Sequence, residues 1–382
     1  MALTNPVCFP NFNPYLCGVE LQKKDIRKLS LPELEEFFLE QGEKKFRAKQ
    51  VYEWLWSKSL KNFDEMSNIS LSTRELLKTH FTINHIRVDL MQHSSDGTIK
   101  NAVKLFDDKI VESVLIPTTK RITACISSQV GCSLDCNFCA TARLKRMRNL
   151  NSDEIYDQVV AIKDEAEIYF QRPLTNIVFM GMGEPLLNYA NVIGAIDKIT
   201  SADGLGMAPR RITLSTVGIP KMIRKMAEDE VKFNLAISLH SAINETRTRL
   251  MPINEVNPLE DLADALSFWY ARTKRKVTYE YVIWEGINDD ERHAKALAKF
   301  CKIIPSKVNL IQYNPIDEGE FRQASQEAVD LYIRVLEGQG IIAKVRKSRG
   351  QDIDAACGQL ANKNEVAQLQ PSENKNSPTE QP

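Results

Sequence analysis

The sequence predicts an α/β protein in which an incomplete barrel of six βα units follows a small helical domain and a short antiparallel β extension. From residue 121 onward, apolar segments alternate with amphipathic ones, the pattern of a parallel sheet with right-handed crossovers. Residues 86–116 show the period of two that is typical of strands, whereas residues 22–82 show a helical period. We therefore place the domain boundaries at 22–85, 86–120 and 121–360.

Three helices are expected in the helical domain. Ser-Leu-Pro-Glu at 30–33 has the form of a capping box, and Gly42 favours the end of the helix that follows. A second helix is expected through residues 47–55, and Ser-Thr-Arg-Glu at 72–75 would open a third.

The β extension is expected to contain three strands, at 86–91, 99–106 and 110–116, with hairpin turns at Asp96-Gly97 and Asp107-Asp108. Glu112 shares the apolar face of the third strand, because side chains alternate between the two faces. A buried carboxylate is costly unless it is paired or functional, and its raised pKa would suit a proton acceptor. The alternative is an edge position from which Glu112 points into water.

The barrel strands are expected at 121–127, 174–180, 210–215, 232–239, 277–283 and 307–313, with a shorter one near 341–346. Helices fit between them, for example at 152–170, 258–272 and 290–302, the second with Asn257 and Pro258 at its start. Residues 361–382 are rich in Asn, Gln, Ser, Glu and Pro and are expected to form a disordered tail. Residues 1–21 form an N-terminal extension.

The overall charge does not indicate a partner, because Lys plus Arg and Asp plus Glu each total 50 among 382 residues. Two acid-free basic runs lie beside cysteines. Such runs are commonly solvated faces, but their position leads us to expect contacts with nucleic-acid phosphates. The runs are Arg143, Lys145, Arg146 and Arg148, and Lys344, Arg346, Lys347 and Arg349.

The N-terminus lacks the features of a signal peptide, and no apolar stretch is as long as a membrane span. We therefore expect a cytoplasmic protein that does not bind a membrane. Eight irregularly spaced cysteines then favour metal-binding or catalytic thiols over structural disulfides. Cys8, Cys17 and Cys301 lie in no motif and are expected to be ordinary thiols.

Cys132, Cys136 and Cys139 follow the spacing C-x3-C-x2-C, one thiol short of a closed metal site. Four thiolates would saturate an iron–sulfur cube or a tetrahedral zinc. Three would leave one iron of a [4Fe–4S] cluster open to an outside ligand. The alternative is a structural zinc that takes Cys125 or Cys357 as its fourth ligand.

Small polar groups follow successive barrel strands, where a binding site is expected. Glycine at 181 and 183 lets a ligand approach the backbone closely, and Glu184 could accept hydrogen bonds from an ammonium group. Each group alone is more typical of a turn or cap, but together they suit a ribose and an amino-acid carboxylate. They are Ser215, Ser238 to Ser241, and Asn314.

Six segments carry a more specific resemblance: Ala-Cys-Ile-Ser-Ser-Gln-Val-Gly-Cys (124–132), Cys-Asn-Phe-Cys-Ala-Thr (136–141), Phe-Met-Gly-Met-Gly-Glu-Pro-Leu (179–186), Leu-Ser-Thr-Val-Gly (214–218), Ile-Ser-Leu-His (237–240) and Ala-Ala-Cys-Gly-Gln-Leu (355–360). In this order they resemble the dual-specificity RNA adenine-C2 methyltransferases, a radical SAM family that modifies 23S ribosomal RNA and some transfer RNAs. The resemblance runs from about residue 22 to 360. It departs at Ala142, where the family pattern has glycine, so it does not define the loop that follows.

The resemblance implies a radical SAM barrel with one [4Fe–4S] cluster per chain, held by Cys132, Cys136 and Cys139. S-adenosylmethionine (SAM) would bind the open iron, and two SAM molecules would be consumed per methylation. The positions that match the SAM contacts of the family are Gly183, Glu184, Ser215, Ser238, Leu239, His240 and Asn314.

The resemblance also implies the catalytic roles. Cys357 would take a methyl group from one SAM, and a radical made from the second SAM would activate that methyl group to add to C2 of adenine. Glu112 would then accept the C2 proton. Cys125 would release the product by forming a transient disulfide with Cys357.

The implied partners are 23S ribosomal RNA, protein-free or assembling, together with transfer RNA and a cytosolic electron donor, and we expect a monomer. The domain at 22–85 would bind RNA, and the extension at 86–120 would carry Glu112. Two alternatives stay open. One is a C8-specific methyltransferase of the antibiotic-resistance type that acts on adenine of 23S ribosomal RNA, and the other is a non-catalytic, zinc-stabilised RNA-binding protein.

Overall fold

The structure is a computed structural model that describes residues 23–317 and 319–363. These residues form two compact units, one of 23–52 with 60–83 and the other of 53–59 with the chain from 84 onward. The expected N-terminal extension at 1–21, with Cys8 and Cys17, lies outside the described residues. The expected tail at 361–382 lies outside them except for its first three residues.

Residues 23–83 contain the three expected helices, α1 (Leu31–Glu40), α2 (Phe46–Trp56) and α3 (Leu71–His80), and two short parallel strands, β1 (Lys24–Asp25) and β2 (Phe81–Thr82). The capping box of α1 is formed, because Ser30 Oγ accepts the Glu33 N–H at 3.4 Å and Glu33 Oε2 accepts the Ser30 N–H at 2.6 Å. Helix α3 begins earlier than the sequence predicted. Ser70, rather than Ser72, caps it by accepting the N–H of Thr73 at 3.2 Å.

A sheet of ten strands forms the centre of the second unit, in the order β14-β13-β12-β11-β10-β9-β6-β5-β4-β3. The expected antiparallel strands are β3 (Arg87–His93), β4 (Ile99–Lys104) and β5 (Ile110–Pro117). The seven parallel strands are β6 (Ile122–Cys125), β9 (Asn176–Phe179), β10 (Ile212–Thr216), β11 (Asn234–Ser238), β12 (Val277–Ile283), β13 (Ser306–Gln312) and β14 (Ile342–Arg346). Because β3 and β14 are edges, the barrel stays open, as the sequence predicted.

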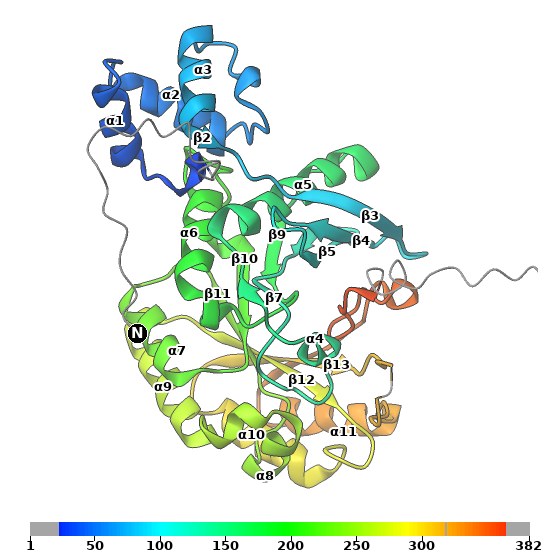
Figure 1. The fold of residues 1–382 in the computed structure, drawn as a ribbon. Coiled ribbons are helices and arrows are strands. Elements are labelled where there is room, and N and C mark those ends of the chain that lie inside the picture. Colours follow the sequence, from blue (N-terminus) through cyan, green and yellow to red (C-terminus); the bar gives the residue numbers. More distant parts are fainter. Residues whose placement is uncertain (1–22, 318, 364–382) are drawn as a thin grey trace, which may run out of the picture. The chain divides into compact units, whose positions relative to one another are not determined.

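Helices between the parallel strands cover the outside of the sheet (Figure 1). They are α5 (Ser152–Phe170), α6 (Tyr189–Thr200), α7 (Pro220–Glu228), α8 (Asn244–Leu250), α9 (Leu259–Thr273), α10 (Glu291–Cys301) and α11 (Gln326–Glu337). The expected cap of α9 is wrong in one respect, because Asn257 does not cap it. Instead, Asn244 Oδ1 accepts the N–H of Leu259 at 3.0 Å, which ties α9 to the start of α8.

The parallel strands are buried, and every residue of β12 is inaccessible to solvent or nearly so. Their shared direction brings the loops after β6, β9, β10, β11, β12 and β13 to one edge. A short antiparallel pair, β7 (Gln129–Val130) with β8 (Arg148–Asn149), brackets the cysteine loop and the short helix α4 (Ala140–Arg143) at that edge. None of the helices in the described ranges combines the length and apolarity needed to cross a membrane.

Candidate active site

A cavity of about 630 Å³ opens at the carboxyl ends of the parallel strands. It brings together segments that are far apart in the chain: the cysteine loop, the loop after β9, the ends of β10, β11 and β13, and the segment that follows β14. All the site residues that the sequence predicted line it, except Leu239 and Glu112. Those that do are Cys125, Cys132, Cys136, Cys139, Gly183, Glu184, Ser215, Ser238, His240, Asn314 and Cys357.

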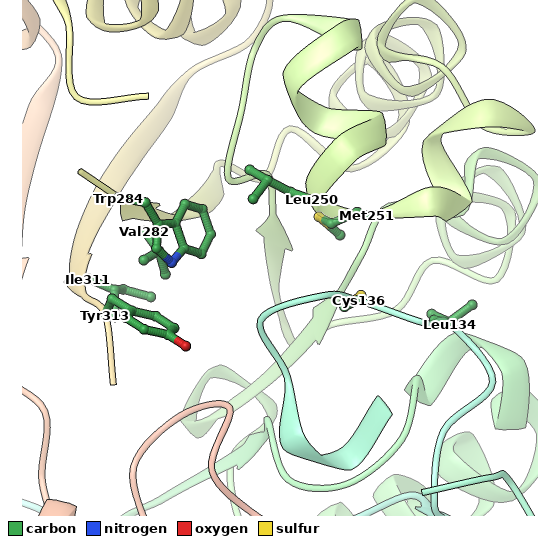
Figure 2. Close-up of a cluster of buried hydrophobic side chains, with 8 residues drawn as sticks. All are labelled: Leu134, Cys136, Leu250, Met251, Val282, Trp284, Ile311 and Tyr313. Carbon is green, nitrogen blue, oxygen red and sulfur yellow. The ribbon is translucent and has the colours of Figure 1, made fainter. Parts of the chain in front are cut away.

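The cysteine loop is held by backbone hydrogen bonds and by an apolar shell. The N–H of Cys132 donates to Leu144 O at 3.2 Å, and the N–H of Cys139 donates to Cys136 O at 3.1 Å. Figure 2 shows the shell, in which the loop meets the chain after α8 and the ends of β12 and β13. Its buried side chains are Leu134, Cys136, Leu250, Met251, Val282, Trp284, Ile311 and Tyr313.

The surroundings of the three loop thiols disfavour thiolates that are not bound to a metal centre. Burial raises the pKa of Cys132 to about 11 and raises that of Cys136 and Cys139 as well. The thiols also oppose one another, since Cys139 and Cys132 raise the pKa of Cys136 further. Three thiolates that repel one another would be stabilised by a cationic metal centre, so this donor set fits the [4Fe–4S] cluster that the spacing predicts. Among the described residues, no three His, Cys, Asp or Glu side chains are arranged to hold a single metal ion.

Cys125 and Cys357 lie on another part of the cavity wall. Cys125 is the last residue of β6, and burial, followed by the proximity of Cys357, raises its pKa to about 12. Cys357 follows β14 in a segment fixed at several points. Asn314 Nδ2 donates to the carbonyl of Cys357 at 3.1 Å, and the next carbonyl, of Gly358, accepts the Ala140 N–H at 2.8 Å.

Arg346, which the sequence analysis placed in a run expected to contact phosphates, is also part of the cavity wall. It ends β14 and lines the cavity, where Cys357 and then Glu280 and Cys125 raise the pKa of its guanidinium. Its Nη1 lies 3.6 Å from Glu280 Oε2 on β12. The other oxygen of Glu280 accepts a hydrogen bond from Asn309 Nδ2 at 2.8 Å. The register of the strands brings these three side chains together, because Glu280 pairs with Asn309 and Ile311 pairs with Arg346.

Glu184 and Gly183 follow β9 at the rim. Glu184 is 3 % exposed, and its two carboxylate oxygens accept the N–H groups of Leu186 and Val217 at 3.0 and 2.9 Å. Burial raises its pKa to about 6, so the carboxylate is ionised at neutral pH. Gly183 has a φ of +93°, and a Cβ there would meet the Gln129 side chain at 2.5 Å, so this position requires glycine.

The remaining rim residues end neighbouring strands. Ser215 Oγ and Ser238 Oγ are 3.4 Å apart on β10 and β11. His240 has a φ of +58°, and its Nδ1 accepts the N–H of Val282 at 3.2 Å. Burial lowers the pKa of its imidazole to about 3, so the ring is neutral. Leu239 is buried behind the wall, and its backbone N–H donates to Glu280 O at 3.0 Å.

Glu112 is buried rather than directed into water, being 1 % exposed. Its Oε1 lies 3.3 Å from Nζ of Lys100, which is also buried. Its Oε2 accepts the backbone N–H groups of Ala361 and Asn362 at 2.8 and 3.2 Å. The carboxylate of Glu112 therefore binds the backbone a few residues after Cys357.

The two basic runs are less free to contact RNA than the sequence suggested. Arg148 is bound by Asp107 and Glu154, each at 2.7 Å, which leaves its guanidinium little capacity for a phosphate. Arg143 donates to the carbonyl of Asp317. Lys145, Arg146, Lys344 and Lys347 remain exposed and are the better candidates.

Comparison with protein families gives two matches. Residues 24–83 match the ribosomal RNA large subunit methyltransferase N-terminal domain, and residues 126–297 match the radical SAM superfamily. The second match covers the cysteine loop and the strand ends up to β12.

The chain is also similar to whole proteins. It is 65 % identical over 349 residues to a Christiangramia forsetii protein named "Probable dual-specificity RNA methyltransferase RlmN", which covers 91 % of this chain and 99 % of the relative. It is 42 % identical to the "Dual-specificity RNA methyltransferase RlmN" of Geotalea uraniireducens, over 89 % of this chain and 97 % of that one. Among solved structures, a radical SAM methyltransferase from Sphaerobacter thermophilus superposes with a TM-score of 0.83 and 36 % identity, covering 88 % of this chain and 99 % of the other.

Proposed function

Because the chain belongs to the RlmN family of dual-specificity RNA methyltransferases, which are radical SAM enzymes, we propose that it places a methyl group on C2 of adenine in 23S ribosomal RNA and in some transfer RNAs. The observation that carries the proposal is the presence of Cys125 and Cys357 in the same cavity as the three-cysteine loop. A protein that only holds a cluster or a zinc ion needs no such second pair. Family membership also disfavours the non-catalytic, zinc-stabilised alternative.

The cofactors proposed are one [4Fe–4S] cluster per chain on Cys132, Cys136 and Cys139, and two SAM molecules per methylation. When bound, the cluster and SAM together supply a radical that can remove a hydrogen atom from a methyl group. The other SAM molecule would be the methyl donor to Cys357. A separate methyl carrier is needed because C2 of adenine is too electron-poor to attack SAM as an ordinary nucleophile.

Cys357 is the nucleophile that takes the methyl group, and the chain supplies what this step requires. A thiolate attacks a methyl group far more readily than a thiol does. Arg346 lines the same cavity and provides a positive charge near Cys357. The hydrogen bond from Asn314 to the Cys357 carbonyl fixes the backbone that carries the sulfur.

Glu112 is the proposed acceptor of the C2 proton, and its position implies a movement. The carboxylate is 1 % exposed and is bound by the backbone of residues 361 and 362. It can meet an adenine in the cavity only after that backbone releases it. Cys125 then attacks the sulfur of Cys357 and breaks its bond to the methylene carbon. That carbon takes up a proton and remains on the base as its methyl group, and the two sulfurs form a disulfide.

SAM would lie along the rim of the cavity. Glu184 offers a buried carboxylate to its ammonium group, while Ser215 and Ser238 offer hydroxyl groups to the ribose and carboxylate. His240, in its neutral form, and Asn314 complete the polar wall. Gly183 allows the loop that carries Glu184 to pack against Gln129, and Leu239 would contribute through its backbone.

The domain roles remain those expected from the sequence. We propose that residues 22–85 bind RNA, that 86–120 present Glu112, and that 121–360 form the catalytic core. The proposed protein is a cytoplasmic monomer that receives electrons from a cytosolic donor. Its RNA is protein-free or assembling when it is modified, because the target adenine must be unstacked to reach the cavity.

The test is an anaerobic assay with reconstituted protein, SAM, a reductant and protein-free 23S ribosomal RNA, followed by digestion and mass spectrometry of the nucleosides. We expect 2-methyladenosine from the wild type and none from Cys357→Ala. Formation of 8-methyladenosine instead would assign the C8 chemistry. No methylated adenosine from a protein that still cleaves SAM would show that the substrate is wrong.

A further inference from the structure

Arg247 on α8 is a fully buried cation that has no carboxylate partner among the described residues. Its side chain is 0 % exposed. Nε donates to Leu239 O at 3.2 Å, Nη1 to Asn254 Oδ1 at 2.7 Å, and Nη2 to the carbonyl of Val217. These acceptors are all neutral, and within the described ranges no Asp or Glu forms an ion pair with it.

A buried charge with no counter-ion is unfavourable, so its presence calls for an explanation. Burial lowers the pKa of Arg247 only to about 10, so the guanidinium stays protonated at neutral pH. Neutral acceptors satisfy its hydrogen bonds but do not cancel its charge. An arginine used only for packing would be expected to have an acidic partner or to reach water.

The helix that carries Arg247 is fastened to the cysteine loop. Asn137, within that loop, donates its backbone N–H to Leu250 O at 3.1 Å and its side-chain amide to Arg249 O at 2.7 Å. Leu250, the last residue of α8, and Met251, which follows it, pack in the same apolar cluster as Cys136 (Figure 2).

Arg247 lies one helical turn before Leu250, whose side chain belongs to the apolar cluster that contains Cys136. The apolar shell excludes water from this region and so weakens dielectric screening. An anionic centre at the loop would therefore feel the charge of Arg247 strongly.

We propose that Arg247 is the fixed counter-charge of the cluster held by the cysteine loop, and that it raises the reduction potential of that cluster. This inference rests on the cluster assignment within the proposed function, but not on the RNA substrate or on the carbon that is methylated. Reduction transfers one electron from a donor to a cluster that its three thiolate ligands have already made anionic. A nearby buried cation stabilises the more negative, reduced form most.

The test is the midpoint potential of the cluster in full-length, anaerobically reconstituted protein without SAM or RNA. Dithionite with redox mediators sets the potential, and electron paramagnetic resonance measures the reduced fraction. For Arg247→Gln we expect a reduction equilibrium constant lower by roughly tenfold, a negative shift of about 59 mV for a one-electron couple. Arg247→Lys keeps the charge and should restore most of the wild-type potential.

A matched control lies two residues away. Arg249 is on the same helix but exposed, so Arg249→Gln removes the same charge where solvent screens it. Its midpoint potential should equal that of the wild type. A shift as large as that of Arg247→Gln would mean that net charge, not the buried position, is responsible, and would overturn the proposal.

A second variant tests the charge without removing the arginine. Asn254 accepts from Nη1 of Arg247, so Asn254→Asp would place a carboxylate against the guanidinium and cancel its charge locally. We expect the potential to fall as in Arg247→Gln. A wild-type potential in cluster-loaded Asn254→Asp and Arg247→Gln would overturn the proposal.

Loss of the cluster is also decisive. If Arg247→Gln cannot hold iron and sulfide while Arg247→Lys can, the charge is required and the proposal stands. If both lose the cluster and Asn254→Asp keeps a normal potential, Arg247 only shapes the loop and the proposal fails. A protein that shows the expected shifts but forms no methyladenosine would refute the proposed function alone.

Discussion

The three loop cysteines and the pair Cys125 and Cys357 face the same cavity, yet their surroundings differ in kind. The loop is packed by apolar side chains, with one buried cation, Arg247, behind it. The pair lies against a polar group formed by Arg346, Glu280 and Asn309. An apolar shell suits thiolates that a metal centre neutralises, whereas a neighbouring guanidinium suits a thiolate that must stay free to attack. Under the proposed function, the same residue type would serve coordination in one place and nucleophilic chemistry in the other.

The largest difference between the two groups of cysteines is expected when one thiol is removed from each group. Cys136→Ala should lose the cluster and all activity, because the two remaining thiols cannot hold it. Cys357→Ala should keep the cluster and SAM cleavage but lose RNA methylation completely. Iron and sulfide analysis, with assays of both reactions, checks each variant. If Cys357→Ala also loses iron, Cys357 is a ligand of the cluster, and the assignment of different roles to the two groups is wrong.

Glu112, which binds the backbone of residues 361 and 362 after Cys357, is itself paired with the buried Lys100. Lys100→Met should leave the Glu112 carboxylate buried without its cation and lower the free energy of unfolding by about 3 kcal/mol. Denaturant unfolding of the protein measures this. Lys100→Met combined with Glu112→Gln should recover most of the loss, because no uncompensated charge remains. If the two substitutions simply add, Lys100 and Glu112 do not interact.

Removing the charge beside the pair should have a smaller, kinetic effect. Arg346→Gln should slow methylation of Cys357 roughly tenfold or more, because a hydrogen bond to a charged group contributes about 1.5–3 kcal/mol. Mass spectrometry of the protein after incubation with SAM and reductant gives the methylated fraction over time. Arg346→Lys should be intermediate, since it keeps the charge without the planar group.

The cluster content of Arg346→Gln separates the two groups of cysteines. It should equal that of the wild type, because Arg346 faces Cys125 and Cys357 rather than the apolar shell of the loop. A variant that methylates Cys357 at the normal rate would show that Arg346 does not stabilise the thiolate. Its side chain would then serve only to fix Glu280.

The parts of this site that a sequence can predict are those encoded in contiguous residues or in strand periodicity. The cysteine spacing is local, and the alternation of strands and helices indicates which residues end parallel strands. Ser215, Ser238 and Asn314 were found at the rim for that reason. The open sheet and its antiparallel extension follow from the same periodicities.

The residues that a sequence missed act through contacts set by register and packing. Lys100 pairs with Val114 and Ala102 with Glu112, so only the antiparallel register brings Lys100 diagonally onto Glu112. Arg346 belongs to a basic run, and only the pairing of β13 with β14 places it at the cavity. Arg247 lies in a polar helix, Asn-Glu-Thr-Arg-Thr-Arg-Leu, whose sequence gives no sign that the first arginine is buried and the second exposed.

The smallest expected effect concerns the rim that the two groups of cysteines share. Burial raises the pKa of Glu184 to about 6 in the folded protein without ligand, so the carboxylate is ionised above that pH and protonated below it. The ammonium group of SAM binds the ionised form. The affinity for SAM should therefore be highest near neutral pH and fall as the pH drops below 6, approaching tenfold per unit. Equilibrium dialysis of reconstituted protein between about pH 5 and 8 measures this.

Glu184→Gln is the matched control, because the amide keeps the size of the side chain but does not titrate. It should bind SAM more weakly at neutral pH and lose the decline below pH 6. The iron content must be measured at each pH, since protonation of the loop thiolates would release the cluster and mimic the effect. If wild-type affinity stays flat while the cluster is intact, Glu184 does not bind the ammonium group, and its carboxylate serves only the N–H groups of Leu186 and Val217.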